Sequence, residues 1–149
     1  MKWTKRQVIN KGLLLFSLTC FSPLASQLVL GIVNTYTQRC GQKIEGPLEM
    51  KVMFERERAK QNISPDKKIG FIWDIQTPGK SGTMRVAHNN YIVLFRKGSN
   101  NSAVVEHEFY HISDGHCDKR SYGSFLNNLR YWLVNEPQAT LYTATGIRL

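Results

Sequence analysis

The chain has 149 residues, which is enough for one domain with a hydrophobic core of its own. Its formal net charge is +9, but residues 27–149 hold sixteen Lys and Arg against eleven Asp and Glu, a net charge of only +5. No run interleaves basic with aromatic residues in the way that is typical of nucleic-acid-binding faces, so a specific nucleic-acid partner is not expected.

Residues 1–33 have the pattern of an export signal, in which the basic segment Met1–Lys11 precedes an apolar run from Gly12 to about Phe21. Two alternatives stay open. One is an uncleaved anchor, because Gly12–Val33 is 22 residues without a charge, and the other is a lipoprotein modified at Cys20. The sequence therefore predicts an exported protein, periplasmic or secreted, or one that associates with a membrane through residues 12–33.

Removal of the signal would leave two cysteines, Cys40 and Cys117, in an oxidising compartment. An even number of cysteines in such a compartment favours a disulfide between them. The alternative is a pair of thiols, because spacing along a sequence does not establish that two cysteines meet.

The domain is expected to occupy residues 34–149 and to begin with an irregular lead-in at residues 34–46. Pro47 is typical of a first helical turn and predicts a helix that runs to about Gln61. Apolar residues on one side of this helix are expected to face the core, and charged residues on the other side to face solvent. These are Leu48, Val52 and Ala59 on the apolar side, and Glu55, Arg56, Glu57 and Arg58 on the solvated side.

Three strands are predicted next, at Ile69–Ile75, Thr83–His88 and Tyr91–Phe95. The last two are separated by Asn89-Asn90, residues that tolerate the positive φ of a two-residue hairpin. The sequence therefore predicts an α+β domain with a short mixed or antiparallel sheet.

A helix is expected after the third strand, because the loop Lys97–Asn101 ends in residues that cap helices. Val105, Phe109 and Ile112 recur at i, i+4 and i+7 and give this helix a core face.

The other side of this helix carries the sequence H-E-x-x-H. His107 and His111 are four residues apart and lie on one face, as two ligands of a tetrahedral zinc ion do. Glu108 borders that face, where it can act as the general base toward a water that the metal activates.

With this motif the chain resembles the zincin metallopeptidases. The metzincin branch would require a Gly and a His where this chain has Asp114 and Cys117. The gluzincin branch takes a Glu followed three residues later by Ala, as in Asn135-Glu136-Pro137-Gln138-Ala139. The resemblance implies that Glu136 is the third ligand, at the start of a short helix capped by Asn135. Gluzincins often carry an acidic or amide residue directly after that Ala, where this chain has Thr140.

Several other residues remain as alternatives for the roles that the motif leaves open. Asp114 and His116 are alternative metal ligands. His116, Tyr122 and Tyr142 are candidate donors to the oxyanion of a tetrahedral intermediate. Phe125, Leu129, Trp132 and Leu133 follow helical spacing before the final helix.

We therefore expect a small zincin-like α+β domain whose sheet packs on the H-E-x-x-H helix and on a C-terminal helix carrying Glu136. The expected function is zinc-dependent hydrolysis of peptide bonds in a peptide or protein substrate extended along Thr83–His88, with Zn²⁺ held by His107, His111 and Glu136. The alternative is a non-catalytic binding domain in which zinc is structural or vestigial.

Overall fold

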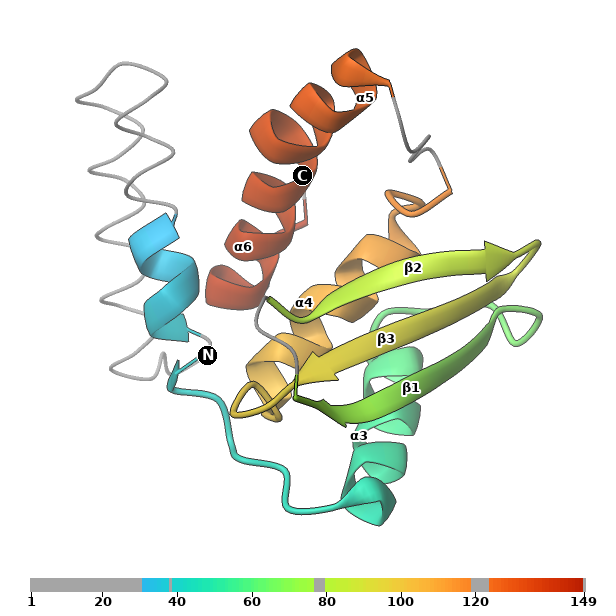
Figure 1. Ribbon diagram of the computed structural model, residues 1–149, viewed down its shortest axis with the longest axis vertical. Helices are drawn as coiled ribbons and strands as arrows, with labels where there is room; N and C mark the ends of the chain where they lie inside the picture. The colour runs from blue at the N-terminus through green and yellow to red at the C-terminus, as the bar shows by residue number, and fades with distance from the viewer. Residues whose placement is uncertain (1–30, 38, 77–79, 119–123, 149) are drawn as a thin grey trace.

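The computed structural model describes residues 31–37, 39–76, 80–118 and 124–148, and Figure 1 presents its elements. Residues 31–37 are helical, so the irregular lead-in expected at residues 34–46 is wrong in its first part. The elements that follow are α3 (Pro47–Lys60), β1 (Lys68–Ile75), β2 (Gly82–Ala87), β3 (Asn90–Arg96), α4 (Ser102–Ser113), α5 (Phe125–Arg130), the π-helical segment η1 (Tyr131–Asn135) and α6 (Glu136–Thr145). The predicted α+β class is confirmed. Most of the expected signal or anchor, and Tyr122, lie outside the described residues. No helix among those that are described is long and apolar enough to cross a bilayer.

The sheet is mixed and has the strand order β1-β3-β2. β3 pairs with β1 in parallel and with β2 in antiparallel fashion, and Asn89 takes a φ of 55° in the hairpin, as its position predicted. The alternation along β3 buries Tyr91, Val93 and Phe95. β3 therefore lies at the centre of the sheet and carries its core face.

The core lies between the sheet, α3 and α4, and Phe54 of α3 is at its centre. Its ring lies 5.2 Å from that of Phe71, 6.2 Å from that of Phe95 and 4.7 Å from that of Phe109, measured between centroids. These contacts join α3 to both neighbouring strands and to α4, which fixes α4 on the sheet.

The predicted faces of α3 are wrong, although its bounds are confirmed. Leu48 and Val52 are 78% and 65% exposed, whereas Met50, Met53, Phe54 and Glu57 are buried. The helix has two apolar stripes, and the one that contains the Phe and the two Met fills the larger space against the sheet. Glu57 is consequently buried, and its carboxylate pairs with Arg56 and Lys60, whose side chains are exposed.

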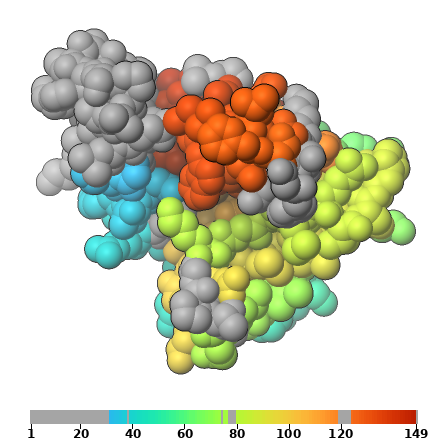
Figure 2. All heavy atoms as spheres, turned by 45° about the horizontal axis from the view of Figure 1, so that its top comes forward, coloured from blue at the N-terminus to red at the C-terminus, as the bar shows by residue number. Residues whose placement is uncertain are grey.

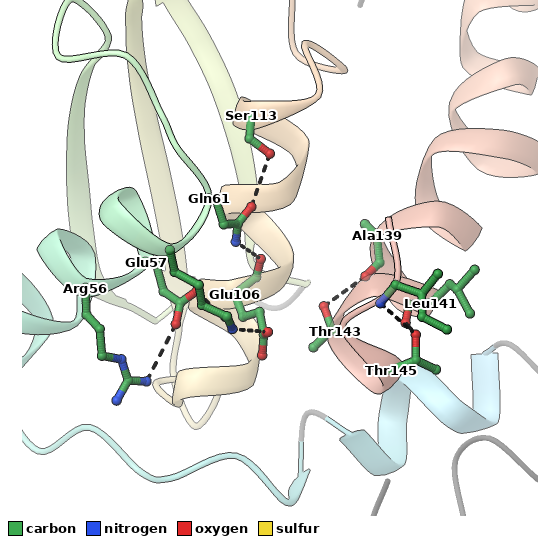
Figure 3. Close-up of polar contacts among 11 residues, drawn as sticks. Arg56, Glu57, Gln61, Glu106, Ser113, Ala139, Leu141, Thr143 and Thr145 are labelled. Carbon is green, nitrogen blue, oxygen red and sulfur yellow. Dashed lines mark hydrogen bonds and ion pairs between the residues drawn. The ribbon is translucent and has the colours of Figure 1, made fainter. Parts of the chain in front are cut away.

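Polar contacts also join α3 to α4 (Figure 3). The Gln61 side chain donates to the backbone oxygen of Glu106 over 3.1 Å and accepts from the Ser113 hydroxyl over 3.1 Å. Lys60 forms an ion pair with Glu106. At the other end of α4, the side chain of Asn101 caps the helix by accepting from two backbone N–H groups. Both ends of α4 are therefore held.

The C-terminal helices form one continuous rod in Figure 1. Asn135 was expected to cap α6, but it has helical angles (φ −70°, ψ −43°) and makes no capping hydrogen bond with its side chain. The chain passes from α5 through η1 into α6 without a break, and Gly146 ends the rod with a φ of 73°. The helical spacing predicted for Phe125, Leu129, Trp132 and Leu133 is present, and all four are exposed.

The expected disulfide is wrong. Within the described part of the chain no bond joins Cys40, which is exposed, to Cys117, which is buried. The Cys117 sulfur lies 4.0 Å from the backbone oxygen of Thr83, under the sheet. An even number of cysteines does not show whether two of them lie close enough to form a bond.

Candidate metal centre

Three side chains from two helices meet at one point beside α4. The Nε2 atoms of His107 and His111 lie 3.2 Å apart. The two carboxylate oxygens of Glu136 each lie 3.4 Å from one of these nitrogens. His107 and His111 are buried, and Glu136 keeps 22% of its side chain exposed. The group therefore offers two imidazole nitrogens and a carboxylate, and it could hold a metal ion.

The spacing of these atoms fits a tetrahedral ion. Bonds of about 2.0–2.1 Å at tetrahedral angles place neighbouring ligand atoms about 3.3–3.4 Å apart. The Nε2–Nε2 distance of 3.2 Å matches this separation, and each of the two nitrogens lies 3.4 Å from a different oxygen of the Glu136 carboxylate. Two imidazoles and one carboxylate also leave the fourth position open, as in a catalytic zinc site.

The π-helical segment η1 brings Glu136 and Tyr131 to the same side of the helix. The Glu136 N–H donates to the oxygen of Tyr131, five residues earlier. In an α-helix residues five apart point about 140° away from each other, whereas the wider π turn brings them closer to one face. The Tyr131 ring stacks on His111 at 5.4 Å with an interplanar angle of 22°, while Glu136 contacts the Nε2 atom of the same imidazole.

Glu108 lies beside this group and is held by the sheet. Its Oε2 accepts a hydrogen bond of 2.8 Å from the Thr83 hydroxyl at the start of β2. The side chain is 4% exposed and lines the same cleft as His107 and Glu136. The carboxylate of Glu108 is thus fixed next to the metal-binding group without belonging to it.

His116 and Asp114 do not belong to the metal-binding group. His116 contacts the other ring nitrogen of His111, and Asp114 contacts His116. The Nδ1 atoms of His111 and His116 lie 3.0 Å apart, and the Nε2 of His116 lies 3.0 Å from the Asp114 carboxylate. The carboxylate only accepts hydrogen bonds, so the Nε2 of His116 carries the proton. A neutral His116 can then accept from the Nδ1–H of His111, which leaves the Nε2 of His111 as the atom that would bind a metal ion.

The pKa directions describe the centre without a metal ion, in which the imidazoles of His107 and His111 can be protonated at Nε2 and donate to Glu136. Burial, followed by the charge of His111, lowers the pKa of His116 to about 4, which keeps the ring neutral near pH 7. Burial opposes the ionised form of Glu136, but hydrogen bonds from His107 and His111 outweigh it and hold the pKa of this carboxyl well below its usual range. Burial likewise opposes protonation of His107, but the hydrogen bond to Glu136 and the charge of Glu108 raise its pKa above the ordinary value.

Two of the expected oxyanion donors, His116 and Tyr142, do not line the cleft. Tyr142 packs 4.8 Å from Tyr110 in a small cluster between α4 and α6, where it has a core role. His116 is engaged with His111 and Asp114, which excludes it from the cleft side of the group. Tyr122 lies outside the described residues.

A cleft of about 430 Å³ opens in front of His107, Glu108 and Glu136. Its walls come from the start of β2, the end of β3 and η1, while α5 stands at the surface next to the sheet in Figure 2. The other lining residues are Asn34, Lys80, Ser81, Gly82, Arg96, Lys97, Gly98, Ser99, Tyr131 and Trp132. No residue of the predicted substrate strand Thr83–His88 lines this cleft, although Gly82, directly before it, does.

Two residues of the site carry no signal in the sequence. Thr83 holds Glu108 from a strand 25 residues away. Tyr131 stacks on His111, and the helical turn that connects Tyr131 to Glu136 is a π turn. A hydroxyl at the start of a strand and an aromatic residue in a helical run are both common, so neither would have been singled out.

Comparison of the chain with protein-family models, with curated proteins and with solved structures found no match.

Proposed function

We propose that the protein is a zinc-dependent hydrolase of peptide bonds, in which His107, His111 and Glu136 hold the metal and Glu108 is the general base. The observation that carries the proposal is the meeting of the His107, His111 and Glu136 side chains at one point, with a second, buried carboxylate, that of Glu108, held beside them. The resemblance of H-E-x-x-H and the later E-x-x-A to zincins of the gluzincin branch supports the same assignment.

Each residue has a defined task in this reaction. A zinc ion at the three side chains supplies Lewis acidity, which polarises a carbonyl and lowers the pKa of water to about 7. Glu108 takes the proton from the water that attacks the scissile carbonyl and later gives it to the leaving amine. Thr83 keeps the carboxylate of Glu108 in place through its hydrogen bond. His116 and Asp114 hold His111 in the tautomer that presents Nε2 to the metal.

The alternative, a non-catalytic domain with a structural zinc, does not account for Glu108. A closed structural site has four protein ligands and no use for a base. Here the buried carboxylate lies in the open cleft and is held by a hydroxyl from the sheet.

The proposal is tested with the near-isosteric substitution Glu108→Gln. The zinc content and melting temperature should equal those of the wild type. Hydrolysis of a mixed peptide library should fall about 10²–10⁴-fold, because only the base is removed. Glu49→Gln is the control, since Glu49 lies in the first turn of α3, outside the cleft. Wild-type hydrolysis by Glu108→Gln, or a zinc-loaded wild type that cleaves no peptide, would show that the protein is not this enzyme.

A further inference from the structure

The cleft in front of the metal-binding group is rich in positive charge. Lys80, Arg96 and Lys97 line it, and the acidic side chains among its described lining residues are Glu108 and Glu136. Both carboxylates already have tasks at the proposed metal. A divalent cation would offset their two negative charges and leave the lining of the cleft with an excess of positive charge.

Hydrogen bonds hold the two loops that carry these basic residues together. The Ser81 hydroxyl accepts from the backbone N–H of Arg96 over 3.0 Å and is also hydrogen-bonded to the Ser99 hydroxyl. Ser99 in turn donates to the backbone oxygen of Arg96 over 2.7 Å. Gly98 makes the turn between them with a φ of 80°. The rim of the cleft is thus a joined structure rather than two independent loops.

Lys80 and Lys97 are available to a ligand. Both are exposed, and among the described residues neither forms an ion pair with an acidic side chain. The ammonium group of Lys80 lies 5.9 Å from the centre of the ring of Trp132, which also lines the cleft. Charged groups around a concave site attract ligands of the opposite charge.

We propose that the cleft selects peptides that present a carboxylate close to the scissile bond, recognised by Lys80 and Lys97. This inference rests on the proposed function, since it names the substrate class of the same site. The carboxylate can come from an acidic side chain or from the C-terminus of the substrate. The first source makes the enzyme an endopeptidase for acidic segments, and the second makes it a carboxypeptidase.

Binding to the zinc-loaded full chain carrying Glu108→Gln tests the inference without requiring hydrolysis. The probes are four fluorescein-labelled decapeptides: alternating Glu and Ala, or alternating Gln and Ala, each with a free or an amidated C-terminus. We expect binding of the preferred carboxylate to be about tenfold tighter at low salt than binding of its neutral counterpart, and the difference to shrink in 1 M NaCl. Preference for Glu over Gln identifies the side chain as the source, and preference for the free over the amidated end identifies the C-terminus.

Variants of the rim complete the test. Lys80→Gln and Lys97→Gln should each reduce the carboxylate preference about two- to fivefold, whereas Lys51→Gln, an exposed lysine of α3 outside the cleft, should leave it unchanged. The inference is overturned if all four peptides bind equally, if none binds, or if Lys51→Gln has the same effect as the rim variants. A zinc-loaded wild type that cleaves all four peptides alike, with free or amidated C-termini, would overturn the inference and leave the proposed function standing.

Discussion

At the scale of single residues, the proposed metal ligand His111 is supported by residues other than those that the family pattern names. Gluzincins often use an acidic or amide residue after the E-x-x-A alanine, and this chain has Thr140 there. In the proposed metal site, the hydrogen-bonded series His111–His116–Asp114 would take this role, with His116 and Asp114 in the loop directly after α4. His107 has no such support, because among the described residues its buried Nδ1 has no hydrogen-bond partner.

Replacement of His116 should therefore weaken the metal site. His116→Phe keeps the ring packing against Tyr110 but removes the acceptor for His111, so zinc affinity should fall about 10–100-fold. His116→Gln, whose amide oxygen can accept the same hydrogen bond, should recover part of the loss. Chelator competition measures the affinity, and the melting temperature without metal shows whether packing is intact. Equal zinc affinities for the wild type and His116→Phe would mean that the series has no positioning role.

The residues of the motif were predicted correctly as neighbours for a simple reason. The i, i+4 spacing of His107 and His111 needs only a helix, and the sequence indicates that helix through its cap and its apolar stripe. Glu136 could be named only through the family pattern, because its approach depends on a contact across 25 residues. His116 and Asp114 were alternative ligands. His116 instead contacts the Nδ1 atom of His111, and Asp114 contacts His116, which no sequence pattern encodes.

At the scale of elements, the π turn of η1 is what the sequence did not reveal. Asn135 and Pro137 together predicted a fresh helix start, yet helical angles continue through both neighbours of Glu136. A π turn adds one residue to a helix, so Tyr131 and Glu136 can share a face although they are five apart.

Deletions of single residues should distinguish the two parts of this helix. Removal of Leu133 closes the π turn to an α turn and leaves Tyr131 and Glu136 four apart, about 40° from each other, so zinc affinity should change only a few-fold. Removal of Pro137 should instead turn Glu136 by about 100° relative to the buried Ala139 and abolish tight binding. Zinc titration and far-UV circular dichroism check both. Loss of zinc on deletion of Leu133, with retention on deletion of Pro137, would contradict this view of η1.

The two sides of α3 give a second test at this scale. Phe54→Ala should lower the free energy of unfolding of the metal-free protein by about 3–5 kcal/mol, because it leaves a cavity among Phe71, Phe95 and Phe109. Leu48→Ala, at a position that is 78% exposed, should cost less than about 0.5 kcal/mol. Urea denaturation measures both. A larger loss for Leu48→Ala would mean that the apolar side predicted from the sequence is the buried one after all.

At the scale of the whole molecule, the sequence predicted the α+β class and the order of elements, and it left open whether the short sheet is mixed or antiparallel. Each depended on local signals: Pro47 and Asn101 at helix starts, Asn89 in the hairpin and the alternation along β3. The disulfide and the buried side of α3 depended on which surfaces meet, and both predictions were wrong. Export or membrane anchoring through residues 12–33 stays a prediction.

The central claim is that α4 and α6 jointly hold one metal ion, and zinc affinity of the full chain tests it most directly. Chelator competition should give one tight zinc site per chain in the wild type. Glu136→Ala should weaken it more than about a hundredfold, beyond the 10–100-fold that is typical of a lost supporting partner. Glu55→Ala, an exposed glutamate of α3, should leave it unchanged. Zinc affinity that is unaffected by Glu136→Ala, or a wild type that binds no zinc, would contradict the account.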